Sequence, residues 1–254
     1  MNTATNTVIR TTMVTPTDSV NLLSLLWLAS PALPVGGFSY SEGLEAATEW
    51  AGIQDEATAA EWLSDQLQLS LARGDLSIVA AAAKTLAVAD TERLMALNDW
   101  VLQTRESAEF RLQSLQMGRS LMDWLRNLLP TATAQLNLPA DWVPTYPVAF
   151  ALAANGLQKL GLQTPELPDQ DIDITSLVSA YAFGWCETMS QTTVKSIPLG
   201  QSAGQRILLR LAREIPGAVA TAMNLEDHQR QAFTPRLAIL SAQHEHQYSR
   251  LFRS

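Results

Sequence analysis

The chain has 254 residues, of which 47% are apolar and 17% are charged, enough apolar material for a large hydrophobic core. Lys and Arg total 17 against 25 Asp and Glu, and the net charge of −8 without a cluster of basic residues argues against nucleic acid as a partner. Cys186 is the only cysteine, which excludes an internal disulfide and favours a reducing compartment.

The first 20 residues are rich in Thr and Asn, with Arg10 as their only basic residue and no apolar stretch. We expect a disordered N-terminal tail there and not a secretion signal. No apolar stretch is long enough to cross a bilayer, because Lys84 interrupts residues 78–89 and Asn155 interrupts residues 148–157. We therefore expect a cytoplasmic protein with no membrane partner.

Most of the remaining chain shows helical periodicity, and alternating strand patterns are almost absent. In residues 57–73 the apolar positions recur every three or four residues, at Ala59, Trp62, Leu63, Leu67 and Leu71. Gly74 is expected to end this helix and Asp75 to cap the next one. The alanine run at residues 80–83 combines high helix propensity with a small cross-section, so we expect that helix to be central.

A third long helix is predicted over residues 91–129, with a break near Gly118. The prolines of residues 130–147 predict a long loop, a second Pro-rich connection spans residues 164–173, and helix resumes over residues 175–194. No strong shift in composition separates these segments. The sequence therefore predicts one all-α domain, a multi-helix bundle over residues 21–254.

The most unusual segment is residues 30–45, Ser-Pro-Ala-Leu-Pro-Val-Gly-Gly-Phe-Ser-Tyr-Ser-Glu-Gly-Leu-Glu. Its paired glycines permit positive φ, and Ser39 with Glu42 forms a capping box expected to start a helix at Tyr40. A phosphate-binding loop would need a Gly-Lys-Ser/Thr ending, and a nucleophile elbow would need glycine at the position of Ser41. The segment is either a rigid capped turn or a loop that contacts another protein.

Two histidines, His244 and His246, lie close together near the end of the chain. Histidines two residues apart point to different sides of a helix, and the zinc-protease pattern needs a spacing of four. We favour a solvated tail with no metal site. No His, Cys or Lys near Glu42 and Glu45 completes an acid–base pair, so no catalytic residue is assigned.

Residues 28–45 resemble the N-terminal signature of the UreF family. Three further segments resemble family segments in the same order: residues 104–111 with Met117 and Gly118; residues 197–201 with Gly204 and Gln205; and His244 and Glu245 with residues 247–254. Together these four segments span nearly the whole chain after residue 20.

This resemblance implies an all-helical, homodimeric scaffold that is not an enzyme and that acts in nickel insertion into urease. It implies binding to the accessory protein UreD (also called UreH) and, through that complex, to the GTPase UreG and the urease apoprotein. Regulation of the GTPase is also implied. Nickel would be the cargo of the assembled complex, and the chain itself would need no cofactor.

The resemblance also implies two contact surfaces. The GTPase side comprises residues of the glycine segment and of a later helix junction: Gly36, Gly37, Tyr40, Glu42, Lys195 and Gln201. The UreD side comprises residues of a C-terminal tail, expected over residues 241–254 and ordered only when a partner covers it: Tyr248, Ser249, Arg250, Leu251, Phe252 and Arg253. Two alternatives remain, a nickel carrier that uses His244 and His246, and a hydrolase built on Ser39.

Overall fold

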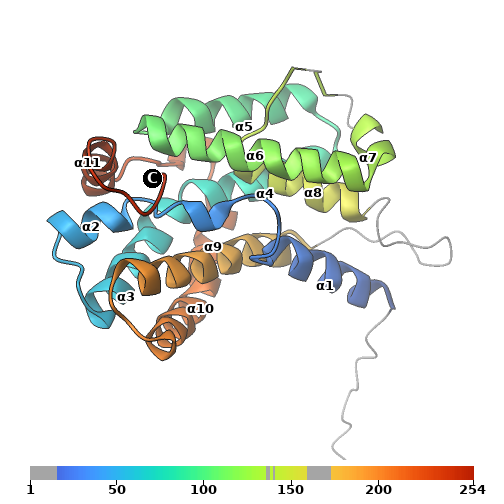
Figure 1. Ribbon diagram of the computed structural model, residues 1–254. Helices are drawn as coiled ribbons and strands as arrows, with labels where there is room; N and C mark the ends of the chain where they lie inside the picture. The colour runs from blue at the N-terminus through green and yellow to red at the C-terminus, as the bar shows by residue number, and fades with distance from the viewer. Residues whose placement is uncertain (1–15, 136–137, 140, 159–172) are drawn as a thin grey trace, which may run out of the picture.

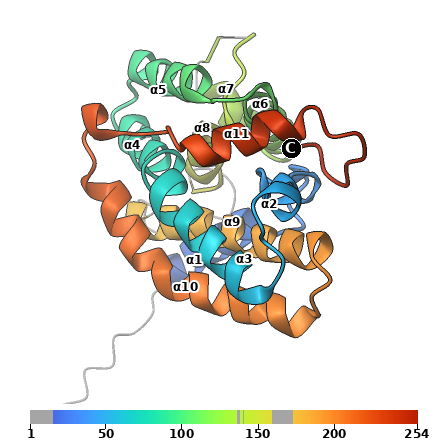
Figure 2. The same cartoon turned by 90° about the vertical axis from the view of Figure 1, so that its left-hand side faces the viewer.

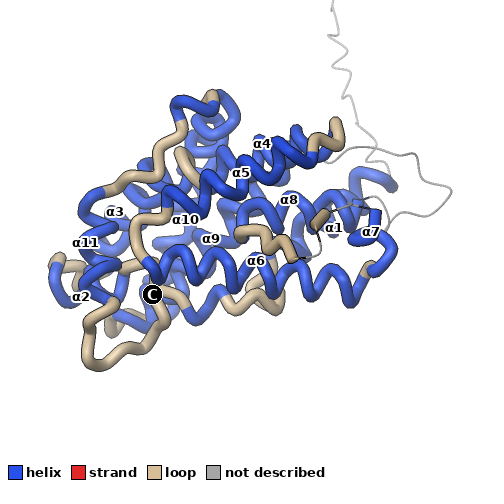
Figure 3. The backbone as a smooth tube through the Cα atoms, turned by 90° about the horizontal axis from the view of Figure 1, so that it is seen from above, coloured by secondary structure: helices blue, strands red, loops and turns tan. Residues whose placement is uncertain are grey.

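The computed structural model describes residues 16–135, 138–139, 141–158 and 173–254, and within these ranges every regular element is a helix (Figures 1 and 3). In chain order the elements are α1 Pro16–Ala29, η1 Gly37–Ser39, α2 Leu44–Trp50, α3 Glu56–Asp65, η2 Gln66–Leu71, α4 Asp75–Ala87, α5 Thr91–Thr104, α6 Ala108–Leu128, α7 Pro130–Gln135, α8 Tyr146–Gly156, α9 Ile174–Ser196, α10 Gln201–Asn224, η4 Asp227–Gln229 and α11 Pro235–His244. The predicted all-α class is confirmed. Residues 1–15 of the expected N-terminal tail lie outside the described ranges, and α1 begins at Pro16, inside the residues predicted as tail.

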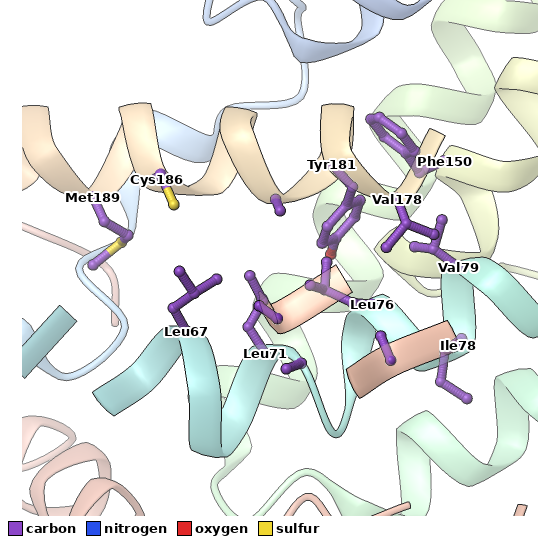
Figure 4. Packing of buried hydrophobic residues seen from close by; sticks show 14 of the residues in the cluster. Leu67, Leu71, Leu76, Ile78, Val79, Phe150, Val178, Tyr181, Cys186 and Met189 are labelled. Atoms are coloured by element: carbon purple, nitrogen blue, oxygen red, sulfur yellow. The ribbon is translucent and has the colours of Figure 1, made fainter. Parts of the chain in front are cut away.

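Helix α9 runs through the middle of the molecule and packs against α10, α4 and α1, while α6 packs against α8 (Figure 1). Figure 4 shows the core beside it, where Tyr181 of α9 lies close to Phe150 of α8 and Leu76 of α4. The alanine-rich helix is central as predicted, because Ala80 and Ala82 of α4 are buried. Small side chains there let neighbouring helices approach closely.

The predicted helix over residues 57–73 is present, but its last part is a π-helix, η2. It begins where Asp55 accepts a hydrogen bond from the Thr58 amide at 2.8 Å. The prediction that Asp75 caps the next helix is wrong. Gly74 occupies the cap position, and Asp75 lies in the first turn of α4 with its carboxylate turned to other partners.

The predicted break at Gly118 is also wrong, because the long helical stretch divides earlier. Arg105 is extended after α5, and Ser107 caps α6 by accepting the Phe110 amide at 3.2 Å. Gly118 lies inside α6, and a Cβ there would meet the Pro144 carbonyl oxygen at 2.0 Å. Glycine is therefore needed at position 118 for close approach of backbone, not for a helix break.

The loop predicted over residues 130–147 is wrong at both ends. Helix α7 begins at Pro130, and α8 begins at Tyr146 with Pro147 in its first turn. Proline is tolerated at both places because the first amides of a helix have no intrahelical acceptor. The second Pro-rich connection lies outside the described residues except for Asp173, which caps α9 by accepting the Ser176 amide at 2.8 Å.

Candidate functional site

Residues 36–43, the glycine turn, contain the short helix η1 and lead into α2. Gly36 and Gly43 have φ of 75° and 78°, and Glu42 also has a positive φ of 50°. Glycine adopts this conformation freely, whereas Glu42 does so at a cost that its contacts must offset. Helix α2 begins only at Leu44, so the predicted capping box that starts a helix at Tyr40 is wrong.

The side chain of Glu42 explains this difference, because it points into the molecule. Its carboxylate accepts hydrogen bonds from Trp185 Nε1 at 2.8 Å and from Gln113 Nε2 at 2.7 Å. Burial raises the pKa of Glu42 above its ordinary value, and the two hydrogen bonds lower it in part. Glu42 therefore holds the turn from inside and does not present its carboxylate at the surface.

Tyr40 is buried as well, at 5% exposure, and its hydroxyl donates to Gln116 Oε1 at 2.5 Å. The structure therefore turns the side chains of Tyr40 and Glu42 inward, and their role as partner contacts stays a prediction. Phe38 is the side chain that this turn presents, at 66% exposure. Sequence reasoning missed Phe38 because aromatic side chains are usually buried. Lys195, in the last turn of α9, and Gln201, the first residue of α10, are exposed as expected.

Behind the glycine turn lies a cavity of about 270 Å³ whose lining includes Phe38, Glu42 and Lys195. Deeper in its wall, Arg105 pairs with Asp75 at 2.6 Å, and the Tyr181 hydroxyl donates to Asp75 at 3.1 Å. Burial raises the pKa of Tyr181 well above its ordinary value, so that phenol stays neutral. These groups form a hydrogen-bonded network around Asp75, in which the buried Arg105 Nε has no hydrogen-bond partner among the described residues.

The nucleophiles of this region are not activated. Burial raises the pKa of Cys186 to about 12, which keeps its thiol protonated. Ser39 makes no hydrogen bond to a histidine within the part of the chain that the structure describes, and its carbonyl accepts the Arg253 amide at 2.8 Å. The geometry therefore does not favour the hydrolase alternative.

The last ten residues, 245–254, form the C-terminal segment, which follows α11 and folds back beside α2 and α6 (Figure 2). The carboxylate of Glu45 accepts the amides of Leu251 and Phe252 at 2.7 and 3.0 Å, and Phe252 is buried. At the end of the segment the Ser254 carbonyl accepts the Ser41 amide at 2.6 Å. The segment therefore lies on the chain's own surface, which differs from the free tail that we predicted.

The residues assigned to the UreD side divide by exposure. Tyr248, Ser249, Arg250, Leu251 and Arg253 are exposed, and Phe252 anchors the segment from inside. Sequence patterns could not separate these roles, because they depend on the carboxylate of Glu45, more than 200 residues away along the chain. Ordering of this segment by a partner stays a prediction.

His244 is fully buried, so the prediction of a solvated histidine is wrong at this position. Its Nε2 lies 3.0 Å from Glu45 Oε2, and its Nδ1 lies 2.9 Å from Glu109 Oε2. His246 is exposed. Within the described residues no group of three or more His, Cys, Asp or Glu side chains could hold a metal ion, so the nickel-carrier alternative is not favoured.

These features define the class of protein. It is a helical protein whose candidate site consists of ordered backbone, an exposed aromatic side chain and inward-facing polar networks, an arrangement suited to contact with other macromolecules. Among the described helices, none is long and apolar enough to cross a membrane.

Comparison with known proteins identifies the family. The UreF family model matches residues 53–164 and 168–212. A urease accessory protein UreF from Polaromonas sp. is 57% identical over 236 residues, covering 93% of this chain and 96% of the relative. Proteins of the same name from Paracidovorax citrulli and Methylibium petroleiphilum are 57% and 55% identical, covering 93% and 94% of this chain and 90% and 96% of theirs. The chain belongs to the UreF family.

Proposed function

We propose that the chain is a urease accessory protein, a scaffold without enzymatic activity that acts in nickel insertion into urease. In this role it bridges UreD/UreH, the GTPase UreG and the urease apoprotein in the cytoplasm, and it regulates the GTPase. Family membership and the shared name of its relatives support the urease role. Nickel is the cargo of the assembled complex and not a resident cofactor of this chain.

The observation that carries the scaffold role is an exposed aromatic side chain on a preordered turn. Phe38 is 66% exposed, while Tyr40 and Glu42 on the same turn are tied to α6 and α9 by hydrogen bonds. An aromatic group on a fixed backbone loses little conformational entropy on binding, which favours an interface hot spot. We place the GTPase contact at Phe38, with exposed Lys195 beside the same cavity.

The UreD/UreH contact is proposed at the outer side of the C-terminal segment. Tyr248 is fully exposed and Leu251 is 74% exposed, whereas the backbone between Leu251 and Arg253 is held by hydrogen bonds. Large apolar side chains on such an ordered segment are suited to burial by a partner.

The proposal is tested by co-expression with UreD, UreG and the urease subunits, followed by purification of the complex through this chain. Phe38→Ala should lower recovery of UreG at least tenfold and leave UreD recovery unchanged. Phe233→Ala is the matched control, since Phe233 is 62% exposed and lies in the connection before α11. Equal UreG recovery with Phe38→Ala and with the control would refute the assignment of Phe38.

A homodimer is also proposed, and exposed side chains on α1 support it. Leu22, Leu23 and Leu26 are each more than half exposed on a helix that packs against α9. A group of exposed leucines on one helix is unusual on a surface that only solvent contacts. Leu23→Glu with Leu26→Glu should convert a dimer to a monomer in sedimentation equilibrium, and a wild-type monomer at all concentrations would refute the dimer.

A further inference from the structure

Three buried polar atoms in the wall of the cavity behind the glycine turn have no hydrogen-bond partner among the described residues. They are Arg105 Nε, Glu106 Oε1 and Thr234 Oγ1, and all three residues line this cavity. Buried polar groups in proteins are almost always hydrogen-bonded, because a buried donor or acceptor that is left unpaired costs free energy. Their shared position indicates that a polar group inside the cavity pairs with them.

These three residues are also neighbours in the fold. Arg105 and Glu106 are consecutive in the connection between α5 and α6, and the backbone amide of Thr234 donates a hydrogen bond to the carboxylate of Glu106. The guanidinium nitrogen can only donate, the ionised carboxylate can only accept, and the threonine hydroxyl can do either. A ligand that satisfies them must carry both an acceptor and a donor.

The charges around the cavity favour a neutral ligand. Its lining residues include the carboxyl groups of Glu42, Asp75 and Glu106 and the cations Arg105 and Lys195. An anion would add a negative charge beside these carboxyl groups, and Arg105 is already paired with Asp75 at 2.6 Å. A cation would suit Glu106 but would leave the donor Arg105 Nε without an acceptor.

A carboxamide group matches the three unpaired atoms. Its oxygen can accept the hydrogen of Arg105 Nε, and one of its two N–H groups can donate to Glu106 Oε1. The hydroxyl of Thr234 can then accept the second N–H or donate to the amide oxygen. Neither a carboxylate nor an amidinium group of the same shape offers both kinds of partner.

Part of the cavity wall, formed by Tyr146, Phe150 and Tyr181, is aromatic and is called the aromatic wall. The ring centroid of Tyr181 lies 5.3 Å from that of Tyr146 and 5.0 Å from that of Phe150, and Figure 4 shows Phe150 and Tyr181 close together. The Tyr181 hydroxyl donates to Asp75, the partner of Arg105, so the aromatic wall adjoins the unpaired polar atoms. Another aromatic ring can extend such a cluster.

The size of the cavity limits the ligand. Its volume of about 270 Å³ lies just below the roughly 300–1,000 Å³ of pockets that hold drug-sized molecules. The exposed side chains of Phe38 and Lys195 also line the cavity and mark its mouth. A single aromatic ring with one polar group is therefore a suitable size.

We propose that this cavity binds a small neutral aromatic carboxamide, whose amide group pairs with Arg105, Glu106 and Thr234 and whose ring packs on the aromatic wall. The inference concerns the chain alone and does not rest on the proposed function.

Three probes of nearly the same shape and different charge test the proposal: benzamide, benzoate and benzamidinium. Each is titrated into the full chain at pH 7 and followed by NMR at the Arg105 Nε–H and at the indole N–H of Trp185, which also lines the cavity. Benzamide should bind with a Kd of about 1 mM or below, as expected for a molecule of its size. It should bind about tenfold more tightly than either ion, because only the amide pairs with both Arg105 and Glu106. Nuclear Overhauser effects should join its ring protons to those of Tyr181.

Two variants locate the amide group. Glu106→Met removes the carboxylate and should weaken benzamide binding about tenfold, because a hydrogen bond to a charged group is lost. Thr234→Val should weaken it about threefold through loss of the hydroxyl. Thr145→Val is the matched control and should leave binding unchanged, since Thr145 Oγ1 is also buried without a partner among the described residues but is not part of the cavity lining.

Several results would overturn the proposal. One is equal binding of the three probes, or tighter binding of either ion. Another is no binding of benzamide at about 10 mM, which would mean that water alone pairs with the three atoms. A folded Glu106→Met protein that binds benzamide as tightly as the wild type would also overturn it. If Glu106→Met does not fold, the three probes on the wild type still decide the question.

Discussion

Gln113 donates its side-chain nitrogen to Glu42 at 2.7 Å, while the oxygen of the same amide accepts the Ser254 hydroxyl at 2.9 Å. One side chain on α6 therefore contacts both the glycine turn and the end of the C-terminal segment. Both hydrogen bonds join residues far apart in the sequence, and both lie in places where water competes little for the same groups.

Replacement of Gln113 by alanine should lower the free energy of unfolding by about 1–3 kcal/mol, because it leaves buried polar partners unsatisfied. Gln103→Ala, at an exposed position on α5, is the control and should change stability by less than about 0.5 kcal/mol. Urea unfolding followed by circular dichroism measures both. Equal stabilities would show that water replaces the Gln113 amide.

Gly118→Ala should be among the most destabilising single-methyl additions in the chain. The new Cβ would lie 2.0 Å from the Pro144 carbonyl oxygen, so backbone must move, and we expect a loss of about 3 kcal/mol. Gly217→Ala in α10 is the control because a Cβ there meets nothing within 4 Å. It should raise stability by up to about 1 kcal/mol through helix propensity. Thermal unfolding that is unchanged in Gly118→Ala would contradict the close approach.

Removal of one partner from the mostly buried pair of Asp75 and Arg105 should destabilise the protein. Asp75→Asn leaves the Arg105 charge poorly compensated in a mostly buried place, and we expect a loss of about 2–4 kcal/mol. Asp123→Asn breaks the exposed pair with Arg126 and should cost less than about 1 kcal/mol. Comparable losses in the two variants by urea unfolding would argue against a special role for the buried pair.

The raised pKa of Glu42 predicts a pH dependence of stability with a definite sign. Burial makes the carboxyl group of Glu42 bind its proton more tightly in the folded protein than in the unfolded chain. Protonated Glu42 therefore contributes to stability at low pH. That contribution is lost as pH rises through the folded pKa. Glu42→Gln should therefore gain stability relative to the wild type between pH 4 and pH 7.

Glu56→Gln provides a control of opposite sign for this prediction. The side chain of Arg206 lowers the pKa of Glu56, so the contribution of Glu56 is present above its unfolded pKa and is lost as pH falls. Urea titrations of the three proteins at several pH values measure both slopes. Parallel slopes for Glu42→Gln and the wild type would contradict the assignment.

Several helix boundaries could not be predicted because the deciding contacts come from elsewhere in the chain. Ser39 and Glu42 have the spacing of a capping box, yet Glu42 is drawn inward by Trp185 and Gln113. A glycine in the middle of a helical pattern predicts a break, but Gly118 is needed because the backbone of Pro144 lies against α6. Local propensity competes here with long-range contacts, and the long-range contacts prevail.

The sequence by itself determined that the chain is all-helical and that the alanine-rich helix is central, because helical periodicity and side-chain size are local properties. Four ordered motifs were also enough to indicate the UreF family. Only the tertiary structure decided that Phe38, and not Tyr40 or Glu42, is the exposed group of the glycine turn. It likewise decided that His244 is buried between Glu45 and Glu109, since burial and hydrogen-bond partners are set by elements that meet only when the chain has folded.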